Sequence, residues 1–340
     1  SITPALTMSN SSTVYAGIKS NDDRTNFNIA NVGYIGSAYL NESGVRSVSF
    51  GLVFNRMQDY SSAQYARGNA IGSSWLQAVA MQSQGIKESV FKSDDAFYSD
   101  APWNGILAYK SFLMDPLPDS DCDYFAAIEN LDPSNHEIYM ASPVDQIYHS
   151  YQRGYQYEAD LNCSINIDNI VYIGANIGLQ TLYYKQSNDY TELPTDVRAC
   201  ESKLSAFTQS YSLRTSGSGV NLKLGIIYTP IPQLRLGASI QTPTWMWLTD
   251  DSEMTISSSF TDGESYHKGS PLLSFDYRLR TPFKWNVGAA LTIAKMAVVS
   301  VDYQRVDYSS MKLSDRNGNS DIFDFDNSII KDCGASCNIF

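Results

Sequence analysis

Apolar and polar residues alternate along two runs, 220–229 and 233–241, of the stretch from Val220 to Leu248. Every second residue is apolar before Pro230 and Pro232, and the alternation resumes from Leu234 to Gln241. Successive side chains of a strand point to opposite faces, so a period of two predicts two antiparallel strands joined by a turn. Runs of about ten residues with one apolar and one polar face are typical of a transmembrane β-barrel, whereas strands of soluble proteins usually have about five or six.

The same alternation recurs along the chain and predicts about ten antiparallel strands, the last of them at 328–340. Short turns are expected at 41–44, 168–169, 229–233 and 294–296, and long loops at 9–25, 61–146, 185–206, 249–270 and 307–327. Short and long connections alternate, as in a barrel with turns on one side of the membrane and loops on the other. The predicted fold is therefore all-β, an antiparallel up-and-down transmembrane barrel that forms a single domain over 1–340, with an extracellular insertion at 61–146.

Composition agrees with this fold and excludes two other classes of protein. Charged residues make up 18% of the chain, below the roughly 25% of ordinary soluble proteins. No run of about 18 apolar residues exists, which excludes a helical membrane protein. The net charge of −12 argues against nucleic acid as a partner, because binding phosphates needs clustered Lys and Arg. The five cysteines form no CxxC or metal-ligand spacing, so no cofactor is expected.

The insertion at 61–146 carries large apolar residues among many Asp and Ser. Ile71, Trp75 and Val79 repeat at helical spacing, which predicts a short amphipathic helix at 73–84. Two interpretations stay open: an extracellular groove that captures a hydrophobic ligand, or a cap that packs on itself. The candidate ligand-binding residues of such a groove are Trp75, Leu76, Val79, Trp103, Leu107 and Phe112.

Three cations occupy polar positions in the alternation of their strands and are expected to point into the lumen. They are Lys223, Arg235 and Lys284. Each of these cations can pair there with the carboxylate of a fatty acid. The alternative is that they are hydrated or pair with other groups of the lumen.

Two further features leave alternatives open. Pro243 interrupts a predicted strand, where proline is tolerated mainly at bulges and edges. A bulge would shift the phase and turn Trp245 and Trp247 to the lipid, whereas an unbroken phase would turn them to the lumen. A loop near the carboxyl end is either solvated or a weak calcium site with four alternating oxygen-bearing residues. These residues are Asp315, Asn317, Asn319 and Asp321.

Three stretches carry a resemblance to a known family. They are YTPIPQLRLGASIQTPTWMWLTD at Tyr228–Asp250, RTPFKWNVGAALTIAKMAVVSVDYQRVDYSSMKL at Arg280–Leu313, and NVGYIGS with SFGLVFNRMQDY within Phe27–Tyr60. They resemble the FadL/TodX family of outer-membrane transporters of hydrophobic compounds. The resemblance implies a fourteen-stranded barrel, an amino-terminal hatch, a hydrophobic extracellular capture site and a lateral exit at a kink in the third strand. Compared with this family, the chain lacks the hatch and about four strands, so we expect a fragment.

These patterns predict passive transport of hydrophobic molecules, such as long-chain fatty acids or aromatic hydrocarbons, across the bacterial outer membrane. Capture at the extracellular loops would be followed by diffusion through the barrel. The expected partners are outer-membrane lipid and a hydrophobic small-molecule ligand, and the expected state is a monomer without enzymatic activity. One alternative is a general porin or structural barrel, which needs a polar constriction. A further alternative is a lipid hydrolase, which needs Ser, His and an orienting polar group close together.

Overall fold

The computed structural model describes residues 1–40, 44–132, 134–135, 137–293 and 296–340. Two of the predicted turns, at 41–44 and 294–296, fall on residues 41–43 and 294–295 and so lie outside the described residues. Most of the described chain belongs to one antiparallel sheet of 15 strands, which confirms the all-β, antiparallel prediction.

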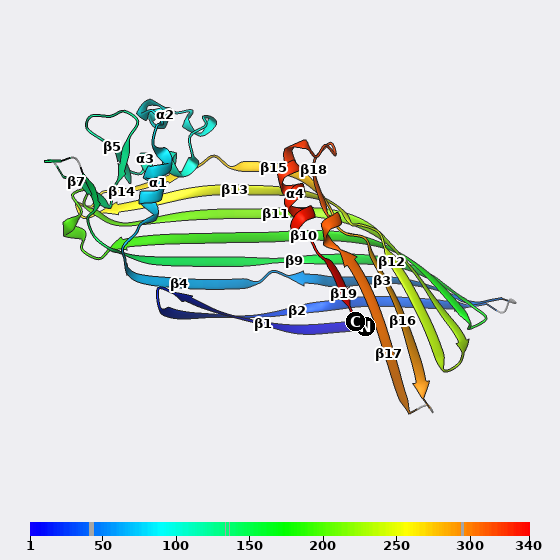
Figure 1. The fold of residues 1–340 in the computed structure, drawn as a ribbon. Coiled ribbons are helices and arrows are strands. Elements are labelled where there is room, and N and C mark those ends of the chain that lie inside the picture. Colours follow the sequence, from blue (N-terminus) through cyan, green and yellow to red (C-terminus); the bar gives the residue numbers. More distant parts are fainter. Residues whose placement is uncertain (41–43, 133, 136, 294–295) are drawn as a thin grey trace.

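Ten strands form the main path of the sheet, in the order β1-β2-β3-β9-β10-β11-β12-β16-β17-β19. Their bounds are β1 Ile2–Tyr15, β2 Ile18–Tyr39, β3 Val45–Asp59, β9 Val144–Ile167, β10 Val171–Pro194, β11 Leu204–Ile231, β12 Leu234–Gln241, β16 Lys284–Ile293, β17 Ala297–Asp307 and β19 Ser336–Ile339. Five further strands extend the sheet: β4 Ser62–Ile71, β13 Trp245–Phe260, β14 Ser265–Gly269, β15 Leu273–Arg280 and β18 Lys312–Asp315. In Figure 1, β9, β10 and β11 run the length of the molecule, while β12, β16 and β17 descend at one end.

The central strands are much longer than the sequence pattern predicts. β9 and β10 have 24 residues each and β11 has 28, whereas about nine to eleven residues suffice to cross a membrane. The loops predicted at 9–25, 185–206 and 249–270 are therefore wrong over most of their length, since β1 and β2, β10 and β11, and β13 and β14 continue through them. Runs of Ser, Asn, Asp and Tyr read as loops, but they also suit a strand held by backbone pairing whose two faces both meet water.

The turn predicted at 168–169 is confirmed. Asp168 and Asn169 have φ values of 52° and 59° between β9 and β10. Asn and Asp tolerate this left-handed conformation, and two successive positive φ values match the twist of a tight hairpin.

The tenth strand predicted at 328–340 is wrong. Residues 328–333 lie in the helix α4, Asp324–Cys333, and only β19 near the end of the stretch is extended. The loop predicted at 307–327 contains two turns of 3-10 helix, η3 Tyr308–Ser310 and η4 Asp321–Phe323, in addition to β18. Asp324 and Asp326 lie in the first turn of α4 and Lys331 in the last, where these charges stabilise the helix dipole.

The described residues between 72 and 143 fold as a cap of short elements at one end of the sheet (Figure 1). Its elements are α1 Trp75–Ser83, α2 Glu88–Lys92, η1 Ala96–Tyr98, α3 Trp103–Lys110, β5 Met114–Pro116, β6 Tyr124–Ala126, β7 Glu129–Leu131 and β8 Ile138–Met140, and the 3-10 turn η2, Val197–Ala199, follows β10. The helix predicted at 73–84 is confirmed by α1. Ser74 and Gln77 form a capping box that satisfies backbone N–H groups at its start.

The cap holds most of the large buried side chains of the molecule. Phe91, Ile106 and Leu113 are fully buried there, and burial raises the pKa of Tyr124 to about 12. The core continues into the sheet through Leu204, Phe207 and Ile256 of β11 and β13. The cap is therefore packed onto the ends of these strands.

Candidate functional site

The strands carry one apolar and one polar face in the segment far from the cap, which we call the cap-distal segment. It comprises residues 158–167 of β9, 171–180 of β10 and 220–231 of β11, with β12 and β16 beside them. The apolar face exposes Leu161, Ile173, Ile177, Leu222, Leu224, Ile226, Leu236, Ile240, Val287 and Leu291, each 41–52% accessible. A continuous exposed apolar face of this kind marks an interaction surface.

Two neighbouring strands are interrupted at the same level by a Thr-Pro step. Thr242 and Pro243 separate β12 from β13, and Thr281 and Pro282 separate β15 from β16. Threonine hydroxyls there accept hydrogen bonds from backbone N–H groups of the neighbouring strand. Thr242 Oγ1 accepts from Leu222 N at 3.0 Å. Thr281 Oγ1 likewise accepts from the backbone N of residue 244 at 2.8 Å. Proline lacks the N–H that an unbroken ladder requires, which explains the interruptions.

The interruption at Pro243 also reverses the phase of the strand. Trp245 lies opposite Val220, on the face that carries Leu222, and Trp247 shares that face. Met246, between the two tryptophans, is buried on the polar face. The bulge alternative is therefore confirmed, and both tryptophans lie on the apolar face.

A buried ion cluster lies on the polar face. Lys223 Nζ of β11 is 2.9 Å from Asp160 Oδ1 and also contacts Glu158 Oε1, both of β9. The lysine reaches across β10 at Gly178, where an added Cβ would lie 2.8 Å from Glu158 Oε2 and 2.6 Å from Asn221 Oδ1. Gly178 therefore leaves the space in which the buried charges meet. The cluster carries two carboxylates and one ammonium, so its formal charge is negative.

Amide side chains extend this cluster across the sheet. Glu158 Oε2 accepts hydrogen bonds from Gln180 Nε2 at 2.7 Å and from Asn221 Nδ2 at 2.8 Å. Asp160 Oδ2 accepts from Asn55 Nδ2 at 2.7 Å. Glu158 is only 1% exposed, so these donors replace the water that a carboxylate would otherwise bind.

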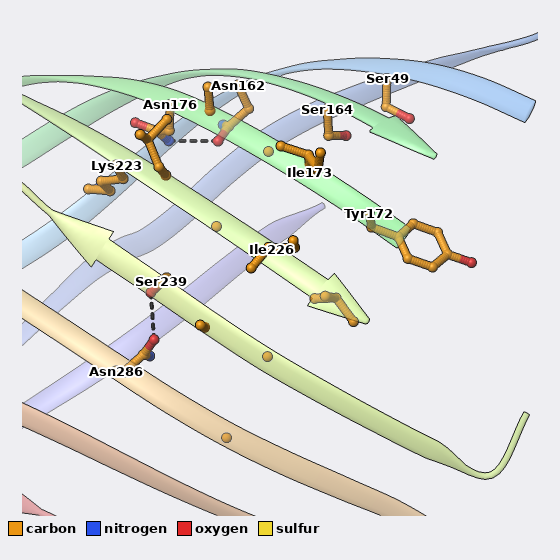
Figure 2. Close-up of a pocket in the computed structure, with 18 of the residues that line it drawn as sticks. Ser49, Asn162, Ser164, Tyr172, Ile173, Asn176, Lys223, Ile226, Ser239 and Asn286 are labelled. Carbon is orange, nitrogen blue, oxygen red and sulfur yellow. Dashed lines mark hydrogen bonds between the residues drawn. The ribbon is translucent and has the colours of Figure 1, made fainter. Parts of the chain in front are cut away.

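A trough of about 950 Å³ runs along the polar face beside the cluster. Asn162, Asn176 and Lys223 line it on one side, with Asn162 and Asn176 joined by a hydrogen bond of 2.6 Å (Figure 2). Ser239 and Asn286, 2.5 Å apart, line it on β12 and β16 (Figure 2). Amides and hydroxyls therefore share the wall of the trough with glycines and with apolar side chains such as Val53 and Ile227.

The three predicted lumen cations all belong to the polar phase. Arg235 lines the trough, and Lys284 shares a cross-strand row with Lys223 through Gln241. Lys223 already contacts two carboxylates, so an acidic ligand approaching it would meet net negative charge. Arg235 and Lys284 remain the better candidates for pairing with a ligand carboxylate.

Three of the six predicted capture residues are buried in the core of the cap. Leu76, Val79 and Leu107 are at most 2% exposed, so their side chains fill the cap instead of lining a groove. Trp75 stacks on a β11 phenylalanine with ring centroids 5.8 Å apart, and Trp103 packs edge-on against another ring of the cap at 5.6 Å. These contacts favour the interpretation of a cap that packs on itself. Of the six, Phe112 is the most accessible at 52%, beside Tyr266.

The oxygen-bearing loop is organised by its own backbone. Asp315 Oδ1 accepts from the N–H groups of Asn317 and Asn319, each at 2.8 Å, and Asn319 Nδ2 donates to Asp321 Oδ2 at 3.1 Å. These hydrogen bonds occupy oxygens that a calcium ion would need. Over the described residues, no group of three or more His, Cys, Asp and Glu side chains gathers as a metal site.

A second buried carboxylate, Glu192 of β10, was missed by sequence reasoning because it lies in a predicted loop. It contacts Ser74 Oγ, and it accepts hydrogen bonds from Trp75 N at 2.8 Å, Gln146 Nε2 at 3.1 Å and Tyr190 Oη at 2.6 Å. Glu192 therefore joins the start of helix α1 to β9 and β10. A glutamate in a polar run gives no sign of this role, since its partners other than Tyr190 lie far away in the sequence.

One serine–histidine pair bears on the hydrolase alternative. Ser257 Oγ lies 2.8 Å from His267 Nδ1 on the hairpin formed by β13 and β14. A hydrolytic triad also needs a group that orients the imidazole, and among the described residues no carboxylate is hydrogen-bonded to His267. The pair by itself does not form a triad.

None of the helices in the described part of the chain has the length and apolar character required to cross a membrane. Comparisons of the chain with models of protein families, with characterised proteins and with solved structures found no match.

Proposed function

We propose that this chain forms the wall of a β-barrel in the bacterial outer membrane and that hydrophobic molecules pass through it passively. The observation that carries the proposal is the exposed apolar face from β9 to β16, opposite a polar face with buried charges. Lipid solvates the first face, and the second faces a polar interior. A barrel has no free edge, because unpaired backbone groups in lipid cost several kcal/mol each. In the part of the chain that the structure describes, no pairing joins β1 to β19, so closure belongs to the proposal.

Aromatic residues support this placement. Trp245 and Trp247 lie at the boundary of the apolar face, and Tyr155 and Tyr183 stand opposite each other nearby on the same face. Amphipathic rings of this kind are enriched where a membrane meets water. The long polar continuation of the strands and the cap then project from one side of the membrane.

The resemblance to FadL/TodX transporters supports a hydrophobic cargo, and the cations of the trough support a cargo with an acid group. We expect Arg235→Gln and Lys284→Gln each to lower uptake of a long-chain fatty acid several-fold, because a charge-assisted pair is lost. Uptake of a neutral hydrocarbon of equal length should not change. The measurement is uptake by vesicles that contain the full chain.

The matched control is Arg46→Gln, which removes an exposed cation at the start of β3 that pairs with Asp168 of the turn between β9 and β10. This control should leave uptake of both ligands unchanged. Equal effects of the Arg235 variant on both ligands would contradict a role in binding the carboxylate.

A second candidate function, a general porin, is supported by the hydrogen-bonding side chains in the wall of the trough. Asn162, Asn176, Ser239 and Asn286 offer hydrogen bonds to small polar solutes. Transport of hydrophobic molecules predicts that affinity rises several-fold per methylene, since each buried CH₂ contributes about 0.8 kcal/mol. Binding that does not change with chain length, together with flux of small polar solutes, would favour the porin.

The two faces also give a direct test of membrane insertion. Leu236→Arg on the apolar face should lower the stability of the inserted protein by about 2–4 kcal/mol if the position lies near the middle of the membrane. Ser239→Arg on the polar face should cost about 1 kcal/mol, for the lost hydrogen bond to Asn286. Denaturant titration of the two variants in lipid vesicles measures both changes. Equal losses at the two positions would mean that no face meets lipid.

A further inference from the structure

Three cations form one cross-strand row on the continuation of the apolar face towards the cap. Lys185 of β10 lies directly opposite Arg153 of β9 and directly opposite Arg214 of β11. Directly opposite residues have Cβ atoms about 4.5–5.5 Å apart, and like charges at this distance destabilise a sheet. The chain as a whole carries a net charge of −12, so this concentration of positive charge needs another explanation.

The row has more positive charge than its neighbours neutralise. Asp251 of β13 is opposite Arg214, and its Oδ2 lies 2.5 Å from the guanidinium. Over the described residues, neither Arg153 nor Lys185 has a carboxylate within 4.0 Å. Arg153 and Arg214 are exposed. Two positive charges of this row are therefore available to an anion.

The position of the row relative to the aromatic and apolar residues indicates which anion. One step closer to the cap-distal segment on the same face, Tyr155 and Tyr183 lie opposite each other with ring centroids 5.8 Å apart. The tryptophans of β13 and then the exposed apolar side chains follow. Beside Trp245, Arg280 and Lys312 form another pair of directly opposite cations on this face. From β9 to β13, apolar, aromatic and cationic side chains thus succeed one another in the order of acyl chain, interface and headgroup of a lipid, while on β15 Arg280 lies level with Trp245.

We propose that Arg153, Lys185 and Arg214 bind the phosphate of a lipid headgroup in the membrane leaflet on the side of the cap. This inference rests on the proposed membrane location. An Arg guanidinium binds phosphate oxygens through two parallel hydrogen bonds, and Lys adds a compact charge between the two arginines. The phosphate relieves the repulsion within the row, and the acyl chains of the same lipid cover the apolar face. This continuity is why the occupant is a phosphorylated lipid and not free phosphate.

The experiment measures binding of phosphorylated lipid A and of its dephosphorylated form to the detergent-solubilised full chain. The phosphorylated form should bind more tightly, and added salt should weaken its binding. Arg153→Gln and Lys185→Gln should each lower this affinity about fivefold, the contribution expected of one cation near an anionic surface. The matched control, Lys203→Gln, removes a cation that pairs with Asp262 at a hairpin end, and should have no effect.

Three outcomes would overturn the proposal: equal affinity for the two lipids, unchanged affinity in both variants, or inorganic phosphate competing at the concentration of the lipid. The last would assign the row to a free anion. Loss of binding by misfolding is excluded if Lys185→Gln, which removes repulsion, is at least as stable as the parent protein. Failure of lipid binding with normal insertion and uptake would leave the proposed function intact, whereas failure of insertion would remove both.

Discussion

Replacing Lys223 by Met is expected to lower the free energy of unfolding by about 3–5 kcal/mol, because it leaves two buried carboxylates without their cation. Glu158 and Asp160 have side chains only 1% and 6% exposed, so water cannot readily replace the ammonium. The amides around Glu158 donate hydrogen bonds but carry no charge. Denaturant titration of the folded full chain in lipid vesicles measures the loss.

The matched comparison removes the charges together. Lys223→Met combined with Glu158→Gln and Asp160→Asn should recover most of the stability, since no buried charge is then left unpaired. A triple variant as unstable as Lys223→Met would mean that the lysine acts through packing and not through its charge. A single variant as stable as the parent would contradict the burial of the cluster.

Replacing Glu192 by Leu is expected to detach the cap from the sheet. Ser74 Oγ, Trp75 N, Gln146 Nε2 and Tyr190 Oη would lose the carboxylate that accepts their hydrogen bonds. Each donor left buried and unpaired costs roughly 1–3 kcal/mol, and we expect a total of about 4 kcal/mol after local relaxation. Protease cleavage within 72–143 should accelerate by about two to three orders of magnitude, because local opening precedes cleavage.

Cleavage at unchanged speed in Glu192→Leu would show that the apolar core alone holds the cap. The conservative variant Glu192→Gln keeps one accepting oxygen and should lie between the parent and the leucine variant. The exposed Glu201, beyond the η2 turn, provides the control, and Glu201→Leu should not change the cleavage rate.

Local sequence was sufficient where one face of a strand is apolar. The alternation around Leu222 and Leu236 predicts both the strands and the faces on which these side chains lie. The same holds for helix α1, whose capping residue Ser74 and apolar spacing act within a few residues of one another. In these segments the apolar residues recur with the period of the strand or of the helix, so the pattern along the chain is enough to predict the element.

Sequence reasoning failed where neither face of a strand is apolar. The polar runs that extend β10 and β11 towards the cap carry no alternation, because both of their faces meet water or the cap. Backbone pairing with a neighbouring strand holds them extended, and the neighbour is known only once the sheet is assembled. The helix α4 was missed although Phe325 and Ile329 recur at helical spacing, because its first turn falls in the predicted loop 307–327 and the rest in the predicted strand 328–340.

The sequence by itself determined the all-β class, the two faces of the cap-distal segment and the polar phase of Lys223, Arg235 and Lys284. Only the tertiary structure decided which charges meet. Lys223 reaches Glu158 across β10, and Lys185 is flanked by cations of two neighbouring strands, because the register of three strands aligns residues distant in the chain. Alternation is a property of each strand alone, whereas register depends on the turns and bulges that join the strands. For that reason, the pattern along the chain predicts a face, and only the assembled sheet shows a site.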